Sequence, residues 1–591
     1  MLSLSVRLLC RTAKARPSAN GCRKDSGTTD DDNNDKLKAA STPRMSILKG
    51  NLFRSQGSCM IRSAPNRVPG LIVGGTGSNA GKTVTTLALL CALQDRGLRV
   101  HAAKTGPDFI DTAFHAALTG APAANLDVWM CRASRPNRAG EPLRRIPQGL
   151  ARIFARMRAP GMDGRAPDIL VVEGAMGLYD GGAGGSGCTA QLAALLGLPV
   201  LLVLNAHGLG QSVAALAEGF LRHRPAWNAG TGQPAFAGMI CTHAGSEKHR
   251  EILRQALAPL VADTGVPLLG LLPRDGAPRL ESRHLGLVEA RESLSGLDRG
   301  ALAAWLETHC DLDELLCSLG APLGNRPQTA LQTTPSTVSA AGGTTAAAAR
   351  FFPPRVRAGE NAGPAARQVR PLLGVARDAA FSFCYADLPA LLQELGADLA
   401  FFSPLSDAAP PPGCCGLYFP GGYPELHATQ LAANTTMRAA LRDMAAQGLP
   451  IYGECGGYIY LMRELRLEGQ GHAMSGLLPL DCRMGDRLAA LGYRAARALP
   501  GWPANVDIPA GIIRVRGHEF HYGRLTQTEL PPGCAPLWQL SDSKGAPLGP
   551  EGCRRGCVAG SWLHLYPEGA RNFWRAWLAA LPASGILAGK P

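Results

Sequence analysis

The chain has 591 residues, of which 46% are apolar and 18% are charged, as in an ordinary globular protein. This length exceeds what one hydrophobic core usually serves, so we expect roughly two to four domains, and no apolar run reaches the roughly 18 residues that a membrane-spanning helix needs. The formal charge of +14 does not indicate a nucleic-acid-binding protein, because residues 1–70 alone hold 13 Lys or Arg against 5 Asp or Glu.

The cysteine usage favours a reducing compartment. The 17 cysteines are odd in number and follow no repeating framework, which is typical of free thiols rather than of a disulfide-bonded scaffold. Cys553 and Cys557 lie close together, but no second pair of Cys or His with zinc-like spacing accompanies them. We therefore expect a cytoplasmic protein without membrane or nucleic-acid partners.

Residues 1–66 show neither a helical nor a strand period. They are rich in Ser, Asn, Lys and Arg and contain an acidic run from Asp30 to Asp35. Such a composition is typical of segments that cannot bury a core. We expect a disordered N-terminal extension here.

Residues 67–311 alternate short apolar runs with longer amphipathic stretches, which is the pattern of a parallel sheet covered by helices. The expected strands are 71–74, 98–103, 168–172, 199–204, 236–241 and 267–272. Helices are expected at 82–96, 188–197, 210–222 and 247–262. In these stretches apolar residues return every three or four positions, and Gly or Pro ends each stretch. The segment predicts a three-layer α/β domain.

Residues 312–370 change in character. They are rich in Ala, Thr, Pro and Gly and show no period, so we expect a linker. After it, strands are expected at 372–376, 399–403, 416–419 and 450–453, and helices at 385–395 and 434–447. A second α/β domain is therefore expected over residues 371–591.

A phosphate-binding loop follows the first expected strand. The sequence LIVGG runs into TGSNAGKTVTT and then a helix, so backbone N–H groups and the helix N-terminus can surround a phosphate chain. Lys82 supplies a point charge, and Thr83 offers a hydroxyl to Mg²⁺. Five residues separate Gly75 from Gly81, where four are usual in the Walker pattern. The strand–loop–helix context nevertheless indicates nucleotide binding.

Acidic residues follow two further expected strands. The sequence AAKTGPDFIDT places Lys104, Asp108 and Asp111 at the carboxyl edge of the sheet, where open α/β folds bind ligands. The sequence VVEGAMGLYDG adds Glu173 and Asp180 at the same edge. Carboxylates beside a triphosphate repel it unless a divalent cation lies between them, so Mg²⁺ is implied. One such acid could equally cap a helix, but four on two strand ends favour metal and substrate handling.

The motifs GTGSNAGKT, KTGPDFID and EGAMGLYDG resemble the synthetase half of the cobyrinic acid a,c-diamide synthase family, which is itself similar to dethiobiotin synthetase. The resemblance spans about residues 69 to 310 and implies a P-loop domain with a parallel sheet. It implies ATP contacts from Gly77, Asn79, Ala80, Gly81, Lys82, Thr83 and Lys104. It also implies Mg²⁺ ligation by Thr83, Asp108 and Glu173, and it brings Asp111 and Asp180 near the substrate carboxylate or its phosphorylated intermediate.

One position departs from the pattern of this family. Relatives usually read Ile-Leu-Asn-Arg where this chain has Ile240, Cys241, Thr242 and His243. The Asn of the family is expected near the adenine base. The contacts of the adenine in this chain, around Thr242, stay open at the level of sequence.

A candidate nucleophile lies in the second domain. The expected strand LPIYG leads into ECGGYIYL, which puts Cys455 on a sharp turn between a strand and a helix. A helix N-terminus aimed at the sulfur favours the thiolate, and nearby N–H groups can stabilise an oxyanion. Gly456 behind the cysteine, and Gly421 and Gly422 in PGGYPE, are the expected oxyanion and glutamine-binding residues.

A thiol nucleophile needs a base, and the candidates are His518 and His521 in RGHEFHY and His564 in GSWLHLYPEG. The sequence from 371 to 580 resembles the cobyrinic and cobyric acid branch of the triad-type (class I-like) glutamine amidotransferases. In that branch the base lies in a late strand before the final helix, which implies His564. Other members of the wider superfamily carry an acid two residues later, but this chain has Tyr566, which is consistent with the Cys–His dyad of the branch.

The two halves imply a ligase that forms C–N bonds with glutamine as the amido donor. Cys455 would release ammonia from glutamine, while ATP would phosphorylate a substrate carboxylate that ammonia then captures. The resemblance implies amidation of the a and c side chains of cobyrinic or hydrogenobyrinic acid in cobalamin biosynthesis, and it leaves the oligomeric state open. Nickel-sirohydrochlorin a,c-diamide synthases share most of these motifs and stay an alternative. A switch ATPase with a deviant Walker loop would explain the loop alone, but not Cys455 and His564.

Overall fold

The computed structural model describes residues 68–132, 145–161, 163–182, 185–274, 297–325, 370–501 and 513–582. The expected N-terminal extension and most of the expected linker lie outside these residues. In the described part of the chain, no helix is long and apolar enough to cross a membrane.

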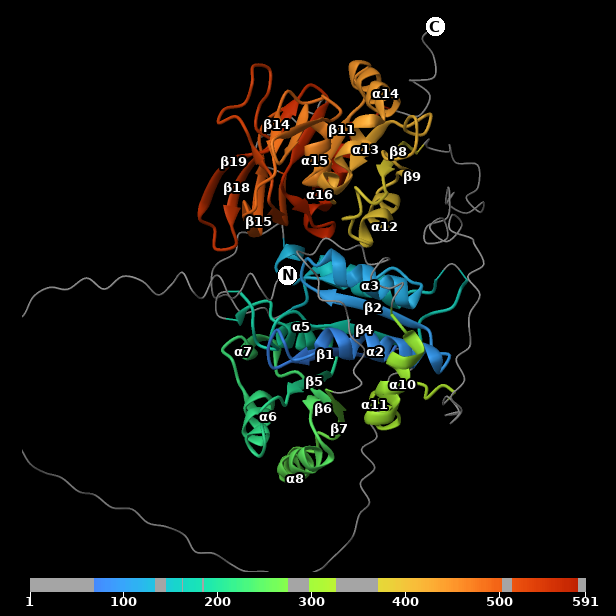
Figure 1. Ribbon diagram of the computed structural model, residues 1–591, viewed down its shortest axis with the longest axis vertical. Helices are drawn as coiled ribbons and strands as arrows, with labels where there is room; N and C mark the ends of the chain where they lie inside the picture. The colour runs from blue at the N-terminus through green and yellow to red at the C-terminus, as the bar shows by residue number, and fades with distance from the viewer. Residues whose placement is uncertain are drawn as a thin grey trace, which may run out of the picture. The chain divides into compact units, whose positions relative to one another are not determined.

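The N-terminal half is built on a sheet of seven parallel strands in the order β3-β2-β4-β1-β5-β6-β7 (Figure 1). Its strands are β1 (Gly70–Gly75), β2 (Val100–Thr105), β3 (Ala124–Leu126), β4 (Ile169–Glu173), β5 (Val200–Asn205), β6 (Phe236–Ala244) and β7 (Leu268–Pro273). The six strands expected from the sequence are confirmed. The short strand β3 was not expected, because its three residues are too few to show a period.

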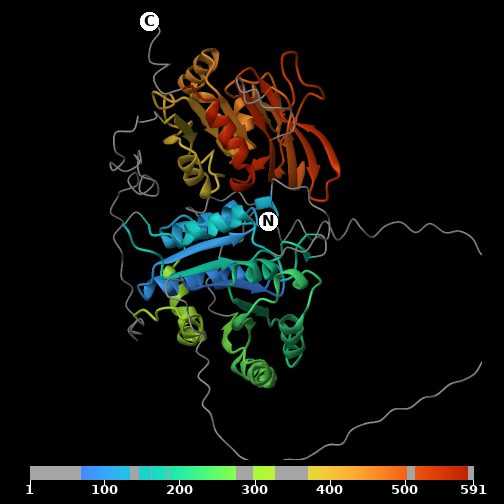
Figure 2. The ribbon, with the colours of Figure 1, turned by 180° about the vertical axis from the view of Figure 1, so that it is seen from behind.

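Alternate residues of each strand point to opposite sides of the sheet. Because the strands are nearly continuous apolar runs, both faces of the sheet are apolar. In β1, Ile72 packs into one core cluster, whereas Leu71 and Val73 pack into the other. The helices that cover the face of Ile72 are α4 (Gln148–Arg158), α5 (Thr189–Leu196), α6 (Ser212–Arg222) and α8 (Glu247–Thr264). The helices on the other face are α2 (Lys82–Asp95), α3 (Phe109–Thr119), α10 (Arg299–His309) and α11 (Leu312–Leu319). The result is the expected three-layer domain, seen from two sides in Figures 1 and 2.

Helix α11 lies inside the range 312–370 that the sequence assigned to the linker. Leu312, Leu315 and Leu316 are buried in the same core cluster as α2 and α10. Asp311 caps the helix by accepting a hydrogen bond from the N–H of Glu314. The first domain therefore continues past residue 311, because the short amphipathic helix α11 packs into its core.

The guanidinium of Arg96, at the end of α2, is a buried connection to α10 and α11. Its Nε and Nη2 donate to the Glu307 carboxylate at 2.6 and 2.7 Å, and its Nη1 donates to Asp313 at 2.5 Å. We expect Arg96→Ala to lower the free energy of unfolding by about 3 kcal/mol, because Glu307 loses its cation in a largely buried position. Thermal unfolding followed by circular dichroism measures this change. A midpoint no lower than that of Arg222→Ala, which removes an exposed ion pair with Glu218, would contradict the prediction.

The C-terminal half has a central sheet in the order β20-β21-β11-β10-β8-β9, parallel except for β20. Its strands are β8 (Leu372–Ala376), β9 (Asp398–Phe402), β10 (Gly416–Phe419), β11 (Ile451–Glu454), β20 (Cys553–Arg555) and β21 (Val558–Ser561). The surrounding helices are α12 (Asp387–Glu394), α13 (Ala428–Ala433), α14 (Thr435–Ala446), α15 (Gly456–Leu461) and α16 (Arg571–Ala579). The four strands expected before residue 454 are confirmed.

Two further sheets in this half were not expected from the sequence. The first has the order β19-β18-β15-β16-β22 and is antiparallel, with strands β15 (Ala490–Ala498), β16 (Arg514–His521), β18 (Trp538–Asp542), β19 (Pro547–Glu551) and β22 (His564–Leu565). The second joins β12 (Glu464–Leu467), β13 (Gln470–Ala473), β14 (Asp481–Arg483) and β17 (Arg524–Leu525). Most of these strands are short or half-exposed, so they lack the continuous apolar runs of the central sheet.

The described residues of both halves belong to one compact unit. Tyr385 and Tyr566 of the C-terminal half are buried in a core cluster whose other buried members come from the N-terminal half. Arg152 and Arg156 of α4 both pair with the carboxylate of Glu568 at 3.0 Å. Apolar burial and ion pairs thus join the two halves.

Candidate active sites

The loop between β1 and α2 is built to receive an anion. The 14-residue helix α2 begins after Gly81, whose φ of 87° lies in the left-handed region, and this N-cap glycine offers no side chain to the first N–H groups. Such N–H groups at a helix start attract phosphate oxygens. An added Cβ at Gly75 would lie 2.8 Å from Cγ of Lys82, so glycine there leaves room for the lysine side chain.

The ammonium group of Lys82 lies within the loop. Its Nζ donates to the carbonyl oxygen of Gly77 at 2.8 Å. Burial, and secondarily the positive charge of Lys104, lowers the pKa of Lys82 to about 8. An anion bound in the loop would favour the charged form of Lys82, so the position suits a phosphate contact.

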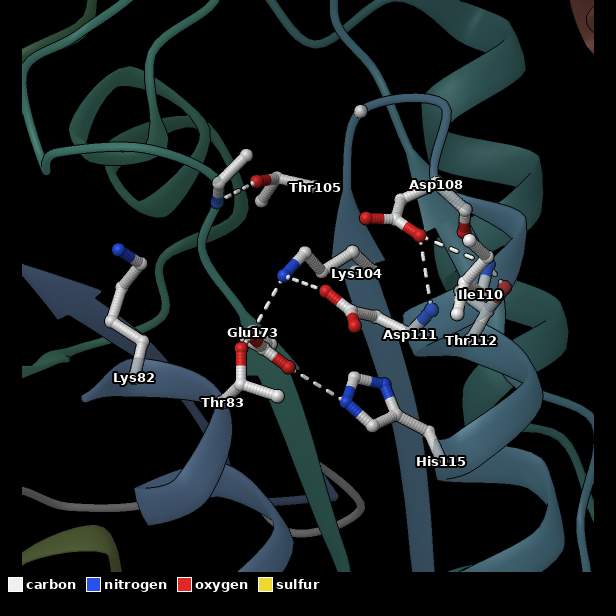
Figure 3. A network of polar contacts seen from close by, with 12 residues as sticks. Lys82, Thr83, Lys104, Thr105, Asp108, Ile110, Asp111, Thr112, His115 and Glu173 are labelled. Carbon is white, nitrogen blue, oxygen red and sulfur yellow. Dashed lines mark hydrogen bonds and ion pairs between the residues drawn. The ribbon is translucent and has the colours of Figure 1, made fainter. Parts of the chain in front are cut away.

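Glu173, at the end of β4, is the centre of a buried polar network (Figure 3). Its Oε1 accepts hydrogen bonds from Thr83 Oγ1 at 2.6 Å and from Lys104 Nζ at 2.7 Å. Its Oε2 lies 2.8 Å from Nε2 of His115, and Lys104 also donates to Asp111 Oδ2 at 2.6 Å. The structure therefore brings together Thr83, Lys104, Asp111 and Glu173, which the sequence had placed on three separate elements.

The charges in this network stabilise one another. Burial by itself would lower the pKa of Lys104, but the negative charges of Asp111 and Glu173 outweigh burial and raise it above its ordinary value. Burial would likewise raise the pKa of Glu173, but the charge of Lys104 and the hydrogen bond and charge of His115 together outweigh burial and lower that pKa. Lys104 thus stays a cation whose direct partners here are two carboxylates.

Asp108 and Asp180 accept hydrogen bonds from nearby backbone N–H groups. Oδ1 of Asp108 accepts hydrogen bonds from the N–H groups of Ile110 and Asp111 at 2.9 and 3.0 Å, which starts α3. Oδ2 of Asp180 accepts from the N–H of Gly177 at 2.9 Å. Asp108 therefore has the helix-capping role that the sequence left open for one such acid, whereas Asp180 closes a turn.

The oxygen atoms around Thr83 fit a magnesium ion. The Thr83 hydroxyl and the Glu173 carboxylate lie 2.6 Å apart, and Mg²⁺ prefers such hard oxygen ligands together with phosphate oxygens. Within the described ranges, no cluster of three or more His, Cys, Asp or Glu could hold a metal ion by itself. A cation here would therefore depend on Thr83, on one or two carboxylates and on the nucleotide.

His115 belongs to this network but was not identified from the sequence. The residue is fully buried in α3, and its Nε2 faces Glu173. A signal was present, because His115 follows Asp111 by four positions and so lies on the same face of the helix. The helix at 109–119 was itself not expected, which hid this spacing.

Thr242, which replaces the expected Asn, is buried behind the phosphate loop. Its Oγ1 donates to the carbonyl oxygen of Ala80 at 2.8 Å, and an added Cβ at Gly81 would lie 3.0 Å from its methyl carbon. Asn205, at the end of β5, donates to the carbonyl oxygen of Asn79 at 3.2 Å. The ends of β5 and β6 therefore hold the backbone of the loop.

Cys455 lies on the turn between β11 and α15. Its φ of 48° and ψ of −102° are unusual for a non-glycine residue, as in a strained nucleophile turn. Its N–H donates to the carbonyl oxygen of Ser561 at 2.8 Å, and its Sγ lies 3.8 Å from the carbonyl oxygen of Phe520. Cys455 thus lies against the end of β21, close in sequence to His564, and against β16, close to His518.

Glycines allow the backbone to approach this cysteine. An added Cβ at Gly456 would lie 2.8 Å from the backbone nitrogen of Gly422, and one at Gly421 would lie 2.3 Å from Cε1 of His564. The loop 420–423 therefore touches both the turn of Cys455 and the imidazole. The backbone of this loop therefore lies next to the turn that carries the candidate nucleophile.

The imidazoles of His518 and His564 face each other across two paired strands. The residues are register partners in β16 and β22, and their rings stack at 4.8 Å with an interplanar angle of 14°. Nδ1 of His518 lies 3.1 Å from the hydroxyl of Tyr385, whereas Nδ1 of His564 is buried and has no hydrogen-bond partner in the described residues. His521 instead stacks on Trp562 at 4.2 Å. Of the three candidates, His564 is the one that also touches the glycine loop.

The sequence predicted that the helix N-terminus favours the thiolate of Cys455, but in the structure burial outweighs that effect and favours the uncharged forms of both the nucleophile and the base. Burial raises the pKa of Cys455 above its ordinary value, with a smaller contribution from the nearby Glu425 carboxylate. It lowers the pKa of His564 well below its ordinary value, with smaller contributions from His518 and His521. A neutral imidazole that shares the glycine loop 420–423 with the cysteine turn is chemically competent to accept a thiol proton.

Tyr566 occupies the position where other amidotransferases carry an acid. Its hydroxyl donates to the carbonyl oxygen of Asn125, in β3 of the N-terminal half, at 2.7 Å. The side chain is buried and does not orient His564 through a charge. The expected Cys–His dyad is consistent with this arrangement.

Comparison with known proteins identifies one domain family for each half. Residues 71–288 match the family described as CobQ/CobB/MinD/ParA nucleotide binding domain, and residues 373–571 match the CobB/CobQ-like glutamine amidotransferase domain. The chain is 38% identical over 502 residues to the hydrogenobyrinate a,c-diamide synthase of Brucella abortus, covering 84% of this chain and 98% of the relative. It is 39% identical over 506 residues to the enzyme of that name from Rhodobacter capsulatus, with the same coverage. The chain belongs to the hydrogenobyrinate a,c-diamide synthase family, which joins an ATP-binding half to a glutamine amidotransferase half.

Proposed function

We propose that this protein converts the a and c side-chain carboxylates of hydrogenobyrinic or cobyrinic acid into carboxamides, with ATP and glutamine as co-substrates. The observation that carries the proposal is that one compact unit holds two sites. The first is the phosphate loop beside the Glu173 network. The second is the strained turn of Cys455, which touches the same glycine loop as His564. The printed names of the relatives support the corrin substrate. The reaction is that of a ligase that forms C–N bonds in cobalamin biosynthesis.

In the C-terminal half, Cys455 attacks the amide carbon of glutamine. His564 accepts the thiol proton and then donates it to the leaving nitrogen, so that ammonia leaves and a thioester forms. The N–H groups of Gly421, Gly422 and Gly456 stabilise the oxyanion. Water then hydrolyses the thioester to glutamate and restores the thiol.

In the N-terminal half, the N–H groups from Gly77 to Thr83 and the side chain of Lys82 hold the phosphates of ATP. An oxygen of the substrate carboxylate displaces ADP from the γ-phosphorus, ammonia attacks the resulting acyl phosphate, and phosphate leaves. We assign Asp111 and Asp180 to the handling of the carboxylate and its acyl phosphate. Lys104 donates hydrogen bonds to Asp111 and Glu173, which supports a role in orienting these two carboxylates. A contact of Lys104 with a phosphate oxygen is a second role that we assign to it.

Magnesium is the cofactor that this site would hold. Thr83 and Glu173 would bind the ion, with Asp108 as a further carboxylate. When bound, Mg²⁺ supplies positive charge beside the β- and γ-phosphates. The residues of this chain orient the nucleotide around it.

We further propose that the protein works in the cytoplasm on small-molecule substrates. Its 14 described cysteines are all free, which supports a reducing compartment.

The direct test is purified protein with glutamine, Mg-ATP and a panel of hydrogenobyrinic acid, cobyrinic acid and nickel sirohydrochlorin. Each carboxylate-to-amide conversion lowers the product mass by about one unit, and tandem mass spectrometry identifies the side chain. We expect diamides of a corrin acid, formed only when ATP is present. ATP hydrolysis without any glutaminase activity would instead indicate a switch ATPase.

His564 and His518 are expected to differ in their effects on glutamine use. His564→Ala should lower glutamine hydrolysis by at least about 100-fold, because the thiol of Cys455 loses its proton acceptor. His518→Ala should lower it less, because that ring stacks on His564 and faces Tyr385 but does not approach the glycine loop. Glutamate release measured for both variants, with ammonium-dependent amidation as the control, decides the base. The reverse order would assign the role to His518.

A further inference from the structure

Phe109 is a residue of the N-terminal half whose ring lies among aromatic rings of the C-terminal half. It is the first residue of α3, directly after Asp108. Its ring centroid lies 5.2 Å from Phe383, stacked at 3°, and 4.6 Å from Tyr385. It also lies 5.4 Å from His564 and 5.7 Å from His518.

These contacts complete a cage around His564. One side of the imidazole stacks on His518, and Gly421 approaches its Cε1 edge so closely that no side chain fits there. Phe383, which stacks on Phe109, is fixed to the same loop because its N–H donates to the carbonyl oxygen of Gly421 at 2.9 Å. Phe109 therefore contacts both the proposed base and the residue that braces the proposed oxyanion loop.

A second connection reaches the same segment. The hydroxyl of Tyr566, two residues after His564, donates to the carbonyl oxygen of Asn125. The side-chain amide of Asn125 in turn donates to the carbonyl oxygens of Gly106 and Asp108 at 2.8 and 3.0 Å. The backbone before Phe109 is thus fixed to the strand that carries His564, which sets where the ring of Phe109 lies.

We infer that Phe109 is a positioning residue for the glutaminase base, supplied by the ATP-binding half. This inference rests on the proposed Cys455–His564 dyad. The ring limits the rotation of His564 and so holds the imidazole in one orientation against the glycine loop that also touches the Cys455 turn. Glutamine hydrolysis therefore depends on Phe109, at the start of α3. Its neighbours Asp108 and Asp111 are assigned to the other active site.

Steady-state kinetics of Phe109→Ala and Phe109→Leu test this inference. For Phe109→Ala, we expect kcat for glutamine hydrolysis to fall about tenfold or more, with KM for glutamine within about threefold, because the base is mispositioned while the glutamine pocket is unchanged. Phe109→Leu, which fills most of the space, should recover at least half of the lost rate on a logarithmic scale. Amidation from ammonium chloride should stay within about twofold in both variants.

Trp129→Leu is the matched control. Its ring contacts Tyr493 at 5.3 Å and lies under the guanidinium of Arg516 at 4.3 Å, so it also joins the two halves, but it does not touch His564. Glutamine hydrolysis should stay within about twofold in this variant. An equal loss in Trp129→Leu, an unchanged kcat in Phe109→Ala, or a parallel loss of ammonium-dependent amidation would each overturn the inference.

Cys455→Ser, assayed in parallel, separates this inference from the proposed function. If Cys455→Ser loses glutamine hydrolysis while Phe109→Ala retains it, only the role of Phe109 fails. If Cys455→Ser retains glutamine hydrolysis, the dyad itself fails, and the positioning role fails with it.

Discussion

Cys455→Ser is expected to lower amidation with glutamine by about three orders of magnitude or more, while amidation from ammonium chloride stays within about twofold. The serine hydroxyl is a much weaker acid than the thiol, and the pKa of His564 is already lowered by burial, so this base cannot activate it. The phosphate loop and the Glu173 network are made entirely of residues from the other half and need only that ammonia arrives. Product formation by mass spectrometry with each nitrogen source measures both rates.

Cys317→Ser is the matched control for this experiment, because Cys317 is exposed on α11. It should leave both rates unchanged. Loss of both activities in a folded Cys455→Ser protein would contradict separate sites for ammonia release and amide formation. Retention of both would remove Cys455 from the mechanism.

Glu173→Gln is expected to lower amidation from either nitrogen source by at least about 100-fold. The substitution keeps the shape of the side chain but removes the charge that Thr83, Lys104 and His115 all contact. Lys104 then keeps only Asp111 as a direct carboxylate partner, and a magnesium ion beside Thr83 loses a ligand. The measurement is the rate of ADP and amide formation with ammonium chloride, together with nucleotide binding by calorimetry with and without Mg²⁺.

Asp163→Asn is the control for Glu173→Gln. Asp163 forms an exposed ion pair with Arg99, where solvent screens the charges. Both amidation rates should stay within about twofold of the unmodified protein. Glutamine hydrolysis by Glu173→Gln measured without ATP should persist, because the dyad lies in the other half. An unchanged rate of amide formation in Glu173→Gln would remove this carboxylate from the chemistry.

Local sequence determined the elements that form each site. Gly81, Lys82 and Thr83 follow a buried strand and start a helix, so the phosphate loop depends only on residues close in the chain. The same holds for Cys455 between β11 and α15, where the turn and the glycine behind it specify the strained conformation. Short apolar runs likewise predicted six strands of the first parallel sheet and four of the second, because burial on both faces leaves continuous apolar runs.

Tertiary structure alone decided which of these residues meet. The spacing of Lys104, Asp111 and Glu173 along the chain cannot show that they share hydrogen bonds, because the pairing of β2 with β4 brings them together. The contact of Phe109 with His564 arises because α3 of one half packs against strands of the other, and residues more than 400 positions apart carry no common period. Local sequence therefore predicted ATP use and glutamine hydrolysis. Long-range packing determined how the residues of each site are held, and it brings Phe109 of one half into contact with His564 of the other.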